Sequence, residues 1–421
     1  MSEQTGLSSR RRDTATLALL ASIAISLLMA SSAPTPLYSV YQQEWSFGPL
    51  TTTVVFGVYA VAVLAALLVV GRVSDHVGRR PVLVVALLMQ AGSMVALIDA
   101  TGVGVLAGAR VVQGLATGAA LGSIGAALLD VDRARGTLLN SAAPAVGTAL
   151  GALVAGLLVQ FLPAPTTLVY AVLLTVFVLQ LVGVAWMRES VERVPGGARA
   201  ALRSLRPEVA VPRRLRGPVL TAAPVLLAVW ALAGFYGSLS PAIVTTLAGH
   251  RSFVLGGLGL FVLAGSGALT TVLTRDLPAR RVMALGGLAL FAGVLLTQVA
   301  VGTGSLVGFF ASTAVAGVGF GAGFQGGLRT VVPLARPHER AGVLSVLYVV
   351  SYSAFGFPAV AAGALLASGG ALHTTSVEYA VAVAALAVLA LLGLARQARS
   401  AAARSAAARP GTCAGTCPEA A

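Results

Sequence analysis

The feature that most constrains the fold of this chain is a regular alternation of long apolar stretches with short loops that carry arginine. Twelve stretches approach or exceed the length of about 20 apolar residues that a helix needs to cross a bilayer. They form two sets of six, at residues 15–33, 50–70, 82–100, 102–128, 138–161 and 166–187, then 218–242, 253–274, 282–301, 304–328, 342–367 and 375–395. Because backbone polar groups find no partners in lipid, each stretch must be a helix. The sequence therefore predicts an all-α integral membrane protein with twelve transmembrane helices.

The distribution of charge predicts how these helices are oriented. Only 10% of the 421 residues are charged, against about 25% in a soluble domain. All 28 basic residues are arginines, and a twelve-helix topology puts every one except Arg110 and Arg251 on the side that holds both termini. The positive-inside rule makes that side cytoplasmic, and the Ala-, Gly- and Val-rich composition indicates a bacterial inner (plasma) membrane. The net charge of +14 follows from this topology and from contact with anionic lipid, so we predict no nucleic-acid partner.

A short charged pattern occurs twice in the chain. Residues 75–80 read DHVGRR and residues 276–281 read DLPARR, and each copy follows the second apolar stretch of its set. This repeat indicates a duplicated protein with two pseudo-symmetric halves of six helices. The predicted segments are an N-terminal half at 1–190, a cytoplasmic linker at 191–214, a C-terminal half at 215–400 and a disordered cytoplasmic tail at 401–421.

The sequence contains no motif that would indicate catalysis or a bound cofactor. Cys413 and Cys417 are the chain's two cysteines, and they have no third or fourth metal ligand nearby and would face a reducing cytoplasm. The chain has no G-x-x-x-x-G-K-[S/T] loop, which excludes an ATPase within it. We predict no metal, no cofactor and no enzyme activity.

Three segments resemble motifs of the major facilitator superfamily. Residues 71–81 resemble its signature loop between spans 2 and 3, with the Gly, Asp, Gly and Arg-Arg positions matched. Residues 106–118 resemble its second motif, which is common in the twelve-span drug/proton antiporters, and residues 143–147 resemble the antiporter motif G-P-x-x-G with Ala143 in place of the first glycine. The resemblance implies the major facilitator fold, in which two six-helix halves surround a central cavity.

The signature loop is predicted to act as a conformational latch. The resemblance implies that its charge cluster clamps the halves together on the cytoplasmic side, and we name the eleventh stretch, from Gly342, as its partner. Asp75 can accept hydrogen bonds from an arginine and lie at a helix N-terminus. The alternative is that the arginines only orient the protein in the membrane and that Asp75 only neutralises part of their charge. The predicted latch residues are Gly71, Asp75, Gly78, Arg79 and Arg80, with Asp276, Arg280 and Arg281 from the second copy.

Arg110 is the most informative single residue for substrate binding. It lies about seven residues into the fourth stretch, on the order of 10 Å deep at 1.5 Å per residue, and buried charges in membrane proteins face an interior or a watery cavity. Gln113 lies one turn away on the same face. Asp99, at the end of the third stretch, either pairs with Arg110 across the short turn or is a solvated loop residue. The alternative for Arg110 is snorkelling to the outer interface.

Aromatic and small residues complete the predicted site. Trp230, Tyr236, Gln325 and Tyr352 are candidates for the cavity wall, where aromatics suit flat, apolar molecules, with helix packing as the alternative for the aromatics. The aromatics near span ends are predicted to form an interfacial belt, namely Tyr38, Tyr41, Trp45 and Trp186. Small residues are predicted to pack helices closely, at Gly114, Gly118, Pro144, Gly147 and Gly151, and the glycine-rich run at 317–327 predicts a bend or hinge.

The predicted function is secondary active transport. The motifs favour export of small amphipathic compounds, hence drug resistance, by a monomer in the bilayer that exchanges them for protons. No Asp, Glu, His or Lys lies deep in a predicted span, so the coupling residue is not identified. Two alternatives stay open: transport of a polar or anionic metabolite whose carboxylate binds Arg110, and, more remotely, a membrane enzyme or sensor on a transporter-like body.

Overall fold

The computed structural model describes residues 2–70, 73–189 and 205–407, and within these ranges the chain is helical with no β-strand. The first half contains α1 (Ser2–Ser32), α2 (Pro34–Trp45), α3 (Pro49–Val70), α4 (Val73–Val77), α5 (Arg79–Ile98), α6 (Val103–Val131), α7 (Arg133–Phe161) and α8 (Pro165–Trp186). The second half contains α10 (Arg216–Ser238), α11 (Ser240–Ala248), α12 (Phe253–Leu273), α13 (Ala279–Gly302), α14 (Leu306–Val331), α15 (Arg340–Ala367) and α16 (Leu372–Ala407). Three single 3₁₀ turns, η1 (Arg213–Leu215), η2 (Val332–Leu334) and η3 (Pro337–Glu339), lie in the connections.

The predicted number of spans is confirmed. Twelve of the described helical segments are long and apolar enough to cross a membrane. Span 1 is built from two helices, α1 and α2, and so extends beyond the predicted end at residue 33, whereas span 7 ends with α10 at Ser238 and α11 follows it. Pro34 is the first residue of α2 and Pro241 the second residue of α11, where a proline removes no needed N–H and has a helical φ. Proline therefore stands where a new helix begins directly after α1 and after α10.

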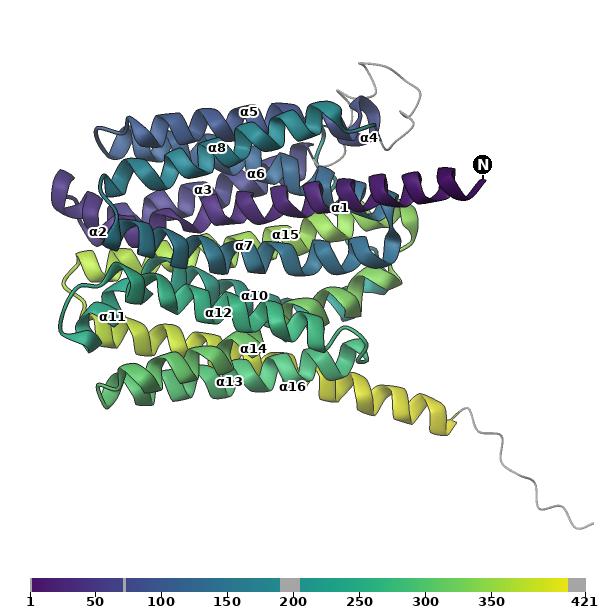
Figure 1. Ribbon diagram of the computed structural model, residues 1–421. Coiled ribbons are helices and arrows are strands. Elements are labelled where there is room, and N and C mark those ends of the chain that lie inside the picture. Colours follow the sequence, from purple (N-terminus) through teal and green to yellow (C-terminus); the bar gives the residue numbers. More distant parts are fainter. Residues whose placement is uncertain (1, 71–72, 190–204, 408–421) are drawn as a thin grey trace, which may run out of the picture.

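The two halves lie side by side, with each apolar core inside its own half. The largest fully buried side chains include Leu20, Leu83 and Phe177 in the first half and Phe309 in the second. Between the halves, α3 packs along α15 and α7 packs along α12. Figure 1 shows the N-terminus, α4 and the C-terminal end of α16 at one end of the bundle, and α2 and α11 at the other. We refer to these as the arginine-rich end and the opposite end.

Glycines allow several helices to approach backbone to backbone. A Cβ added to Gly118 would lie 2.5 Å from the Val63 carbonyl oxygen of α3, and one added to Gly114 would lie 2.7 Å from the Tyr59 carbonyl oxygen. Gly147 and Gly151 of α7 lie in the same way against the α1 backbone. Pro144 lies inside α7. These positions hold α6 against α3 and α7 against α1.

The glycine-rich run at 317–327 does not interrupt its helix. It lies inside α14, which is one continuous helix from Leu306 to Val331. Its glycines contact neighbouring backbones, as at Gly319, where an added Cβ would lie 2.5 Å from the Leu290 nitrogen, and at Gly321, which lies against Gly267 of α12. Close packing on α12 and α13 thus supports a helix that glycine alone would weaken, and a bend or hinge at this run stays a prediction.

The predicted linker and tail lie partly outside the described residues. Residues 205–212 have no regular secondary structure and lead into η1, while the earlier linker residues 190–204 lie outside the described ranges. Helix α16 continues to Ala407, past the predicted start of the tail at residue 401. Cys413 and Cys417 lie in the part of the chain that the structure does not describe.

Candidate transport site

Arg110 lies on α6 and is buried, with 1% of its surface exposed. Its Nη1 donates to the Ser31 carbonyl oxygen at 3.0 Å and to the Gln113 side-chain oxygen. The Gln113 amide in turn donates to the Ala30 carbonyl oxygen at 3.0 Å, and the guanidinium carbon lies 4.1 Å from the centre of the Tyr59 ring. Arg110 therefore points into the bundle, where it contacts the end of α1, and does not snorkel to the surface.

Two tyrosines that were predicted to lie in an interfacial belt are buried beside this group. Tyr38 and Tyr41 are 5% and 1% exposed, because α2 continues span 1 inside the first half. Tyr41 stacks on Trp45 with ring centres 4.6 Å apart, and its hydroxyl donates to that of Tyr170 at 3.2 Å. Tyr38 is an electrostatic neighbour of Arg110. The prolines of residues 34–36 were the only sequence signal that the chain turns here and keeps its aromatics inside.

Asp99 is not paired with Arg110. It caps the end of α5, where its backbone N–H donates to the Val95 carbonyl oxygen at 3.1 Å, and it is exposed. The hydrogen bonds of Arg110 all go to neutral groups. No Asp or Glu is buried among the residues whose side chains the structure describes.

An aromatic cluster from the second half reaches the first half near Arg110. Trp230 lies 4.7 Å from Tyr352, 5.5 Å from Phe355 and 5.8 Å from Phe324, measured between ring centres. Phe355 lies 4.7 Å from Phe56 of α3 across the boundary between the halves. We call these five residues the aromatic wall. The Trp230 indole nitrogen is buried in it and has no hydrogen-bond partner.

The aromatic wall and Arg110 are connected through α3. Phe56 and Tyr59 are three residues apart and so share one face of that helix. Phe56 contacts the wall while Tyr59 lies under the guanidinium. Rings from both halves thus run from the partly buried aromatic wall, through Phe56 and Tyr59 of α3, to a buried cation.

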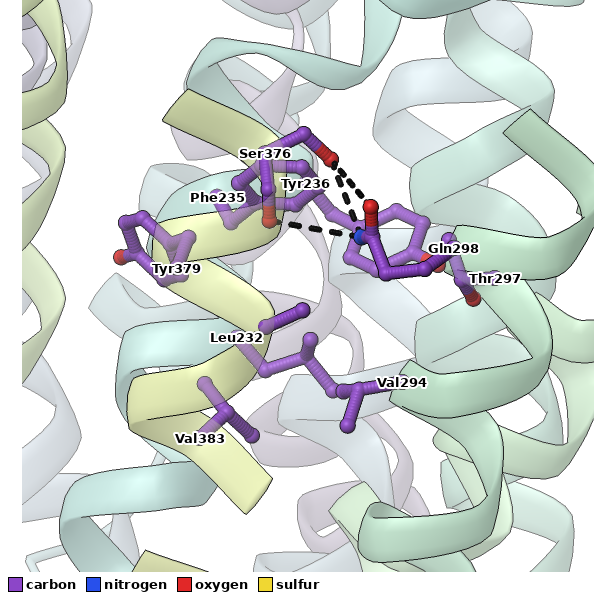
Figure 2. A pocket seen from close by; sticks show the side chains of 10 residues that line it. Leu232, Phe235, Tyr236, Val294, Thr297, Gln298, Ser376, Tyr379 and Val383 are labelled. Atoms are coloured by element: carbon purple, nitrogen blue, oxygen red, sulfur yellow. Dashed lines mark hydrogen bonds between the residues drawn. The ribbon is translucent and has the colours of Figure 1, made fainter. Parts of the chain in front are cut away.

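Tyr236 and Gln325 lie elsewhere in the second half. The Tyr236 hydroxyl hydrogen-bonds that of Thr313 at 2.8 Å, and its ring lines a small cavity between α10, α13 and α16. Figure 2 shows this cavity, with the Gln298 amide donating to the Ser376 hydroxyl at 3.0 Å. Gln325 bonds the hydroxyl of Thr274 and the carbonyl of Thr271 on α12. Both residues connect helices within the second half rather than contact the aromatic wall.

The signature loop forms a cluster centred on Arg79, which is 6% exposed. Its Nη1 donates to Asp75 at 2.6 Å and to the Ser74 hydroxyl at 2.6 Å, and its Nε lies 3.4 Å from Asp130 at the end of α6. The Glu189 carboxylate accepts the backbone N–H of Arg79 at 2.8 Å, which caps the N-terminus of α5. The Arg79 cluster therefore ties α4, α5, α6 and the segment that follows α8 into one unit.

The sequence interpretation missed Asp130 and Glu189. Each is an acid among arginines just after or at the end of an apolar stretch, which is the one signal that could have identified them. Arg80 extends the same unit by donating to the Ala185 carbonyl oxygen of α8. Gly71 lies outside the described residues. Gly342, the predicted partner on α15, lies close to the segment before η1, where a Cβ added to it would be 3.1 Å from the Ala210 carbonyl oxygen. The ion pairs of Asp75 are within the first half, so a contact of the loop with α15 stays a prediction.

The second copy of the loop does not form the same cluster. Asp276 is 87% exposed in its side chain and pairs with its neighbour Arg275 at 3.2 Å. Arg280 donates instead to the Leu394 carbonyl oxygen of α16 at 2.6 Å, and Arg281 is exposed. Ala279 stands where the first copy has Gly78, and α13 begins one aligned position earlier than α5. Within the described residues, the second copy also lacks a helix equivalent to α4, which carries Asp75 in the first.

The halves also meet at the opposite end through polar and close backbone contacts. The Gln160 side-chain oxygen of α7 accepts from the Ser252 hydroxyl at 2.9 Å and from the Val254 backbone N–H at 3.1 Å, at the start of α12. Gly156 and Gly257 bring the α7 and α12 backbones together nearby, and Gly363 of α15 lies against Thr53 of α3. We call this set the opposite-end seal.

Comparison with known proteins agrees with this architecture. The sequence profile described as Major Facilitator Superfamily matches residues 20–292. The fold is similar to the crystal structure of a mutant of the nucleoside transporter NupG, with a TM-score of 0.68, 11% identity, and coverage of 90% of this chain and 99% of that one. At this identity the likeness concerns the fold alone. No curated protein sequence matches the chain. A family profile that spans most of the chain, on a twelve-helix body of two six-helix halves, shows that this protein is a transporter of the Major Facilitator Superfamily.

Proposed function

We propose that this transporter exports small amphipathic compounds in exchange for protons, with its arginine-rich end in the cytoplasm of the cell and its body in the inner membrane as a monomer. The observation that carries the proposal is the row of rings that leads from the partly buried aromatic wall, along one face of α3, to Arg110. Ligand sites are mostly apolar and aromatic with a few placed polar groups. A surface of rings that ends at one cation suits a molecule with an apolar body and a polar head.

The contacts between the halves support alternating access. The opposite-end seal joins α7 to α12 and α3 to α15, and a transporter of this kind releases its substrate when such a seal opens by rocking of the halves. The Arg79 cluster stiffens the cytoplasmic end of the first half, so that the half can move as one body. A contact of Asp75 with α15 in the other state would complete the latch.

The resemblance of residues 106–118 to the drug/proton antiporters supports proton exchange. Since the described side chains include no buried carboxylate, the proton-binding group is sought among half-exposed acids. Asp75 and Asp130 both contact Arg79, and they are the first candidates.

The direct test is accumulation of fluorescent dyes in cells that lack their own efflux pumps and express this chain. The panel contains cationic, neutral and anionic amphipathic dyes, each measured with and without a protonophore. Asp75→Asn should abolish export because it removes the acid that pairs with Arg79 at 2.6 Å. Asp276→Asn is the matched control, since that carboxylate occupies the repeated position but is exposed.

We expect lower accumulation of at least one dye class in cells with the wild-type chain, and loss of this effect with the protonophore or with Asp75→Asn. Cells with Asp276→Asn should retain it. Equal accumulation of every dye with and without the protein, when the protein is present in the membrane, would contradict the proposal.

A further inference from the structure

The Arg110 side chain has a buried nitrogen, Nε, without a hydrogen-bond partner among the described residues, on a residue that is 1% exposed. The hydroxyl of Tyr38, a residue that is 5% exposed, lies beside the guanidinium. Buried polar atoms in proteins are nearly always satisfied, and leaving one unpaired costs about 1–3 kcal/mol. An unpaired nitrogen on a buried guanidinium points to a hydrogen-bond acceptor that binds here.

The charge of Arg110 is also uncompensated. The groups that face it are neutral: the carbonyl of Ser31 on α1, the hydroxyl of Tyr38 on α2, the ring of Tyr59 on α3 and the amide of Gln113 on α6. Charged side chains within membrane spans usually pair with an opposite charge or mark a path for substrate. No Asp or Glu with a described side chain is buried here, so the counter-charge has to come from outside the chain.

The unpaired atoms specify the chemistry of this counter-charge. Arg110 uses Nη1 for Ser31 and Gln113, which leaves the edge formed by Nε and Nη2 without hydrogen bonds in the described structure. That edge presents two parallel N–H groups, which match the two oxygens of a carboxylate. The Tyr38 hydroxyl lies beside the guanidinium and can donate a third hydrogen bond to the same carboxylate. One arginine balances a monoanion, whereas a phosphate dianion would remain half unpaired.

The rest of the ligand is specified by the aromatic wall. Tyr59 contacts Arg110 and shares one face of α3 with Phe56, whose ring centre lies 4.7 Å from that of Phe355. We therefore expect the group attached to a carboxylate at Arg110 to extend along this face towards the aromatic wall. These rings favour an aromatic or other apolar body.

We propose that Arg110 and Tyr38 bind the carboxylate of the transported compound, so that the substrates are small monocarboxylates with an apolar, preferably aromatic, body. This inference rests on the proposed function and narrows its substrate class. Arg110 is 1% exposed, so the carboxylate reaches it when the two halves separate and is enclosed when they meet.

The test is binding of three probes that differ only in the head group: 4-phenylbutyrate, 4-phenylbutanol and 4-phenylbutylamine. The full chain is purified, and the dissociation constant of each probe is taken from its concentration-dependent thermal stabilisation. The variants are Arg110→Gln, Arg110→Lys and Tyr38→Phe. Tyr41→Phe is the matched control, because Tyr41 is an equally buried α2 tyrosine whose hydroxyl contacts Tyr170 instead.

Wild-type protein should bind 4-phenylbutyrate at least tenfold more tightly than the alcohol or the amine. Arg110→Gln should remove this preference, and Arg110→Lys should retain a part of it. Tyr38→Phe should weaken binding of the carboxylate alone, by about tenfold to a hundredfold, as expected for a hydrogen bond to a charged group. Tyr41→Phe should bind all three probes as the wild type does. If Arg110→Gln does not fold, the comparison of Tyr38→Phe with Tyr41→Phe decides the question.

Equal or tighter binding of the amine or the alcohol would overturn the carboxylate assignment, as would an unchanged constant for 4-phenylbutyrate in Tyr38→Phe. The dye panel separates this failure from that of the proposed function. Energised export of cationic or neutral dyes alone would overturn the carboxylate assignment and leave amphipathic export standing, while energised export confined to anionic dyes would support both.

Discussion

At the scale of the residue, Gly78 supports the Arg79 cluster in two ways, through its backbone conformation and through the space that it leaves for the Glu189 carboxylate. Its φ is +110°, a region that side-chain-bearing residues rarely adopt, and a Cβ added there would collide with the Glu189 carboxylate that caps α5. We predict that Gly78→Ala lowers the free energy of unfolding by about 1–3 kcal/mol and reduces transport, because Glu189 must leave the cap. Thermal unfolding of purified protein measures this. Gly249→Ala is the control, with φ +70° and open space; an equal loss there would show that backbone strain alone matters.

At the scale of the element, the packing of α6 on α3 places Arg110 over Tyr59. Gly118 lies at this contact, where an added Cβ would be 2.5 Å from the Val63 carbonyl oxygen, whereas Gly108 of the same helix has nothing within 4 Å. We predict that Gly118→Val destabilises the protein by about 1–3 kcal/mol through overpacking and weakens probe binding at Arg110. Gly108→Val should change neither. The measurement is the melting temperature of each variant, since both carry the same substitution in the same helix. Similar melting temperatures would contradict close packing of Gly118 on α3.

At the scale of the whole molecule, the opposite-end seal should open during every transport cycle. In a Cys413→Ser/Cys417→Ser background, the double variant Gln160→Cys/Ser252→Cys places one thiol on each half. We predict that joining the two thiols with a short reducible crosslinker stops transport, and that reducing the crosslinker restores it. The original side chains are hydrogen-bonded at 2.9 Å between halves. Gln298→Cys/Ser376→Cys is the control, since that pair is hydrogen-bonded at 3.0 Å within the second half. Dye export before and after reduction is the measurement, and continued export by the crosslinked first pair would contradict rocking of the halves about this seal.

The sequence by itself determined the class, the number of spans and the family of this protein. Lipid offers no hydrogen bonds to the backbone, so twelve apolar stretches could only be twelve helices, and the duplicated loop at 75–80 and 276–281 indicated two halves. Arg110 also stood out from sequence, because a charge so far inside an apolar stretch needs a reason. Each of these inferences rests on a property of one segment, which does not depend on its neighbours.

Only the tertiary structure decided which residues share a site. Tyr38 lies beside Arg110 although 72 positions separate them in the chain, and Asp99, much closer in sequence, does not contact it. Asp130 joins Arg79 from the end of α6 and Glu189 from the segment after α8, while Tyr236 and Gln325 lie within their own half. The physical reason is that the side of a helix a residue occupies is local, but the neighbour on that side is set by how twelve helices pack. The repeated loop shows the same limit, since Arg79 pairs with Asp75 while Arg280, at the aligned position, donates to Leu394 of α16.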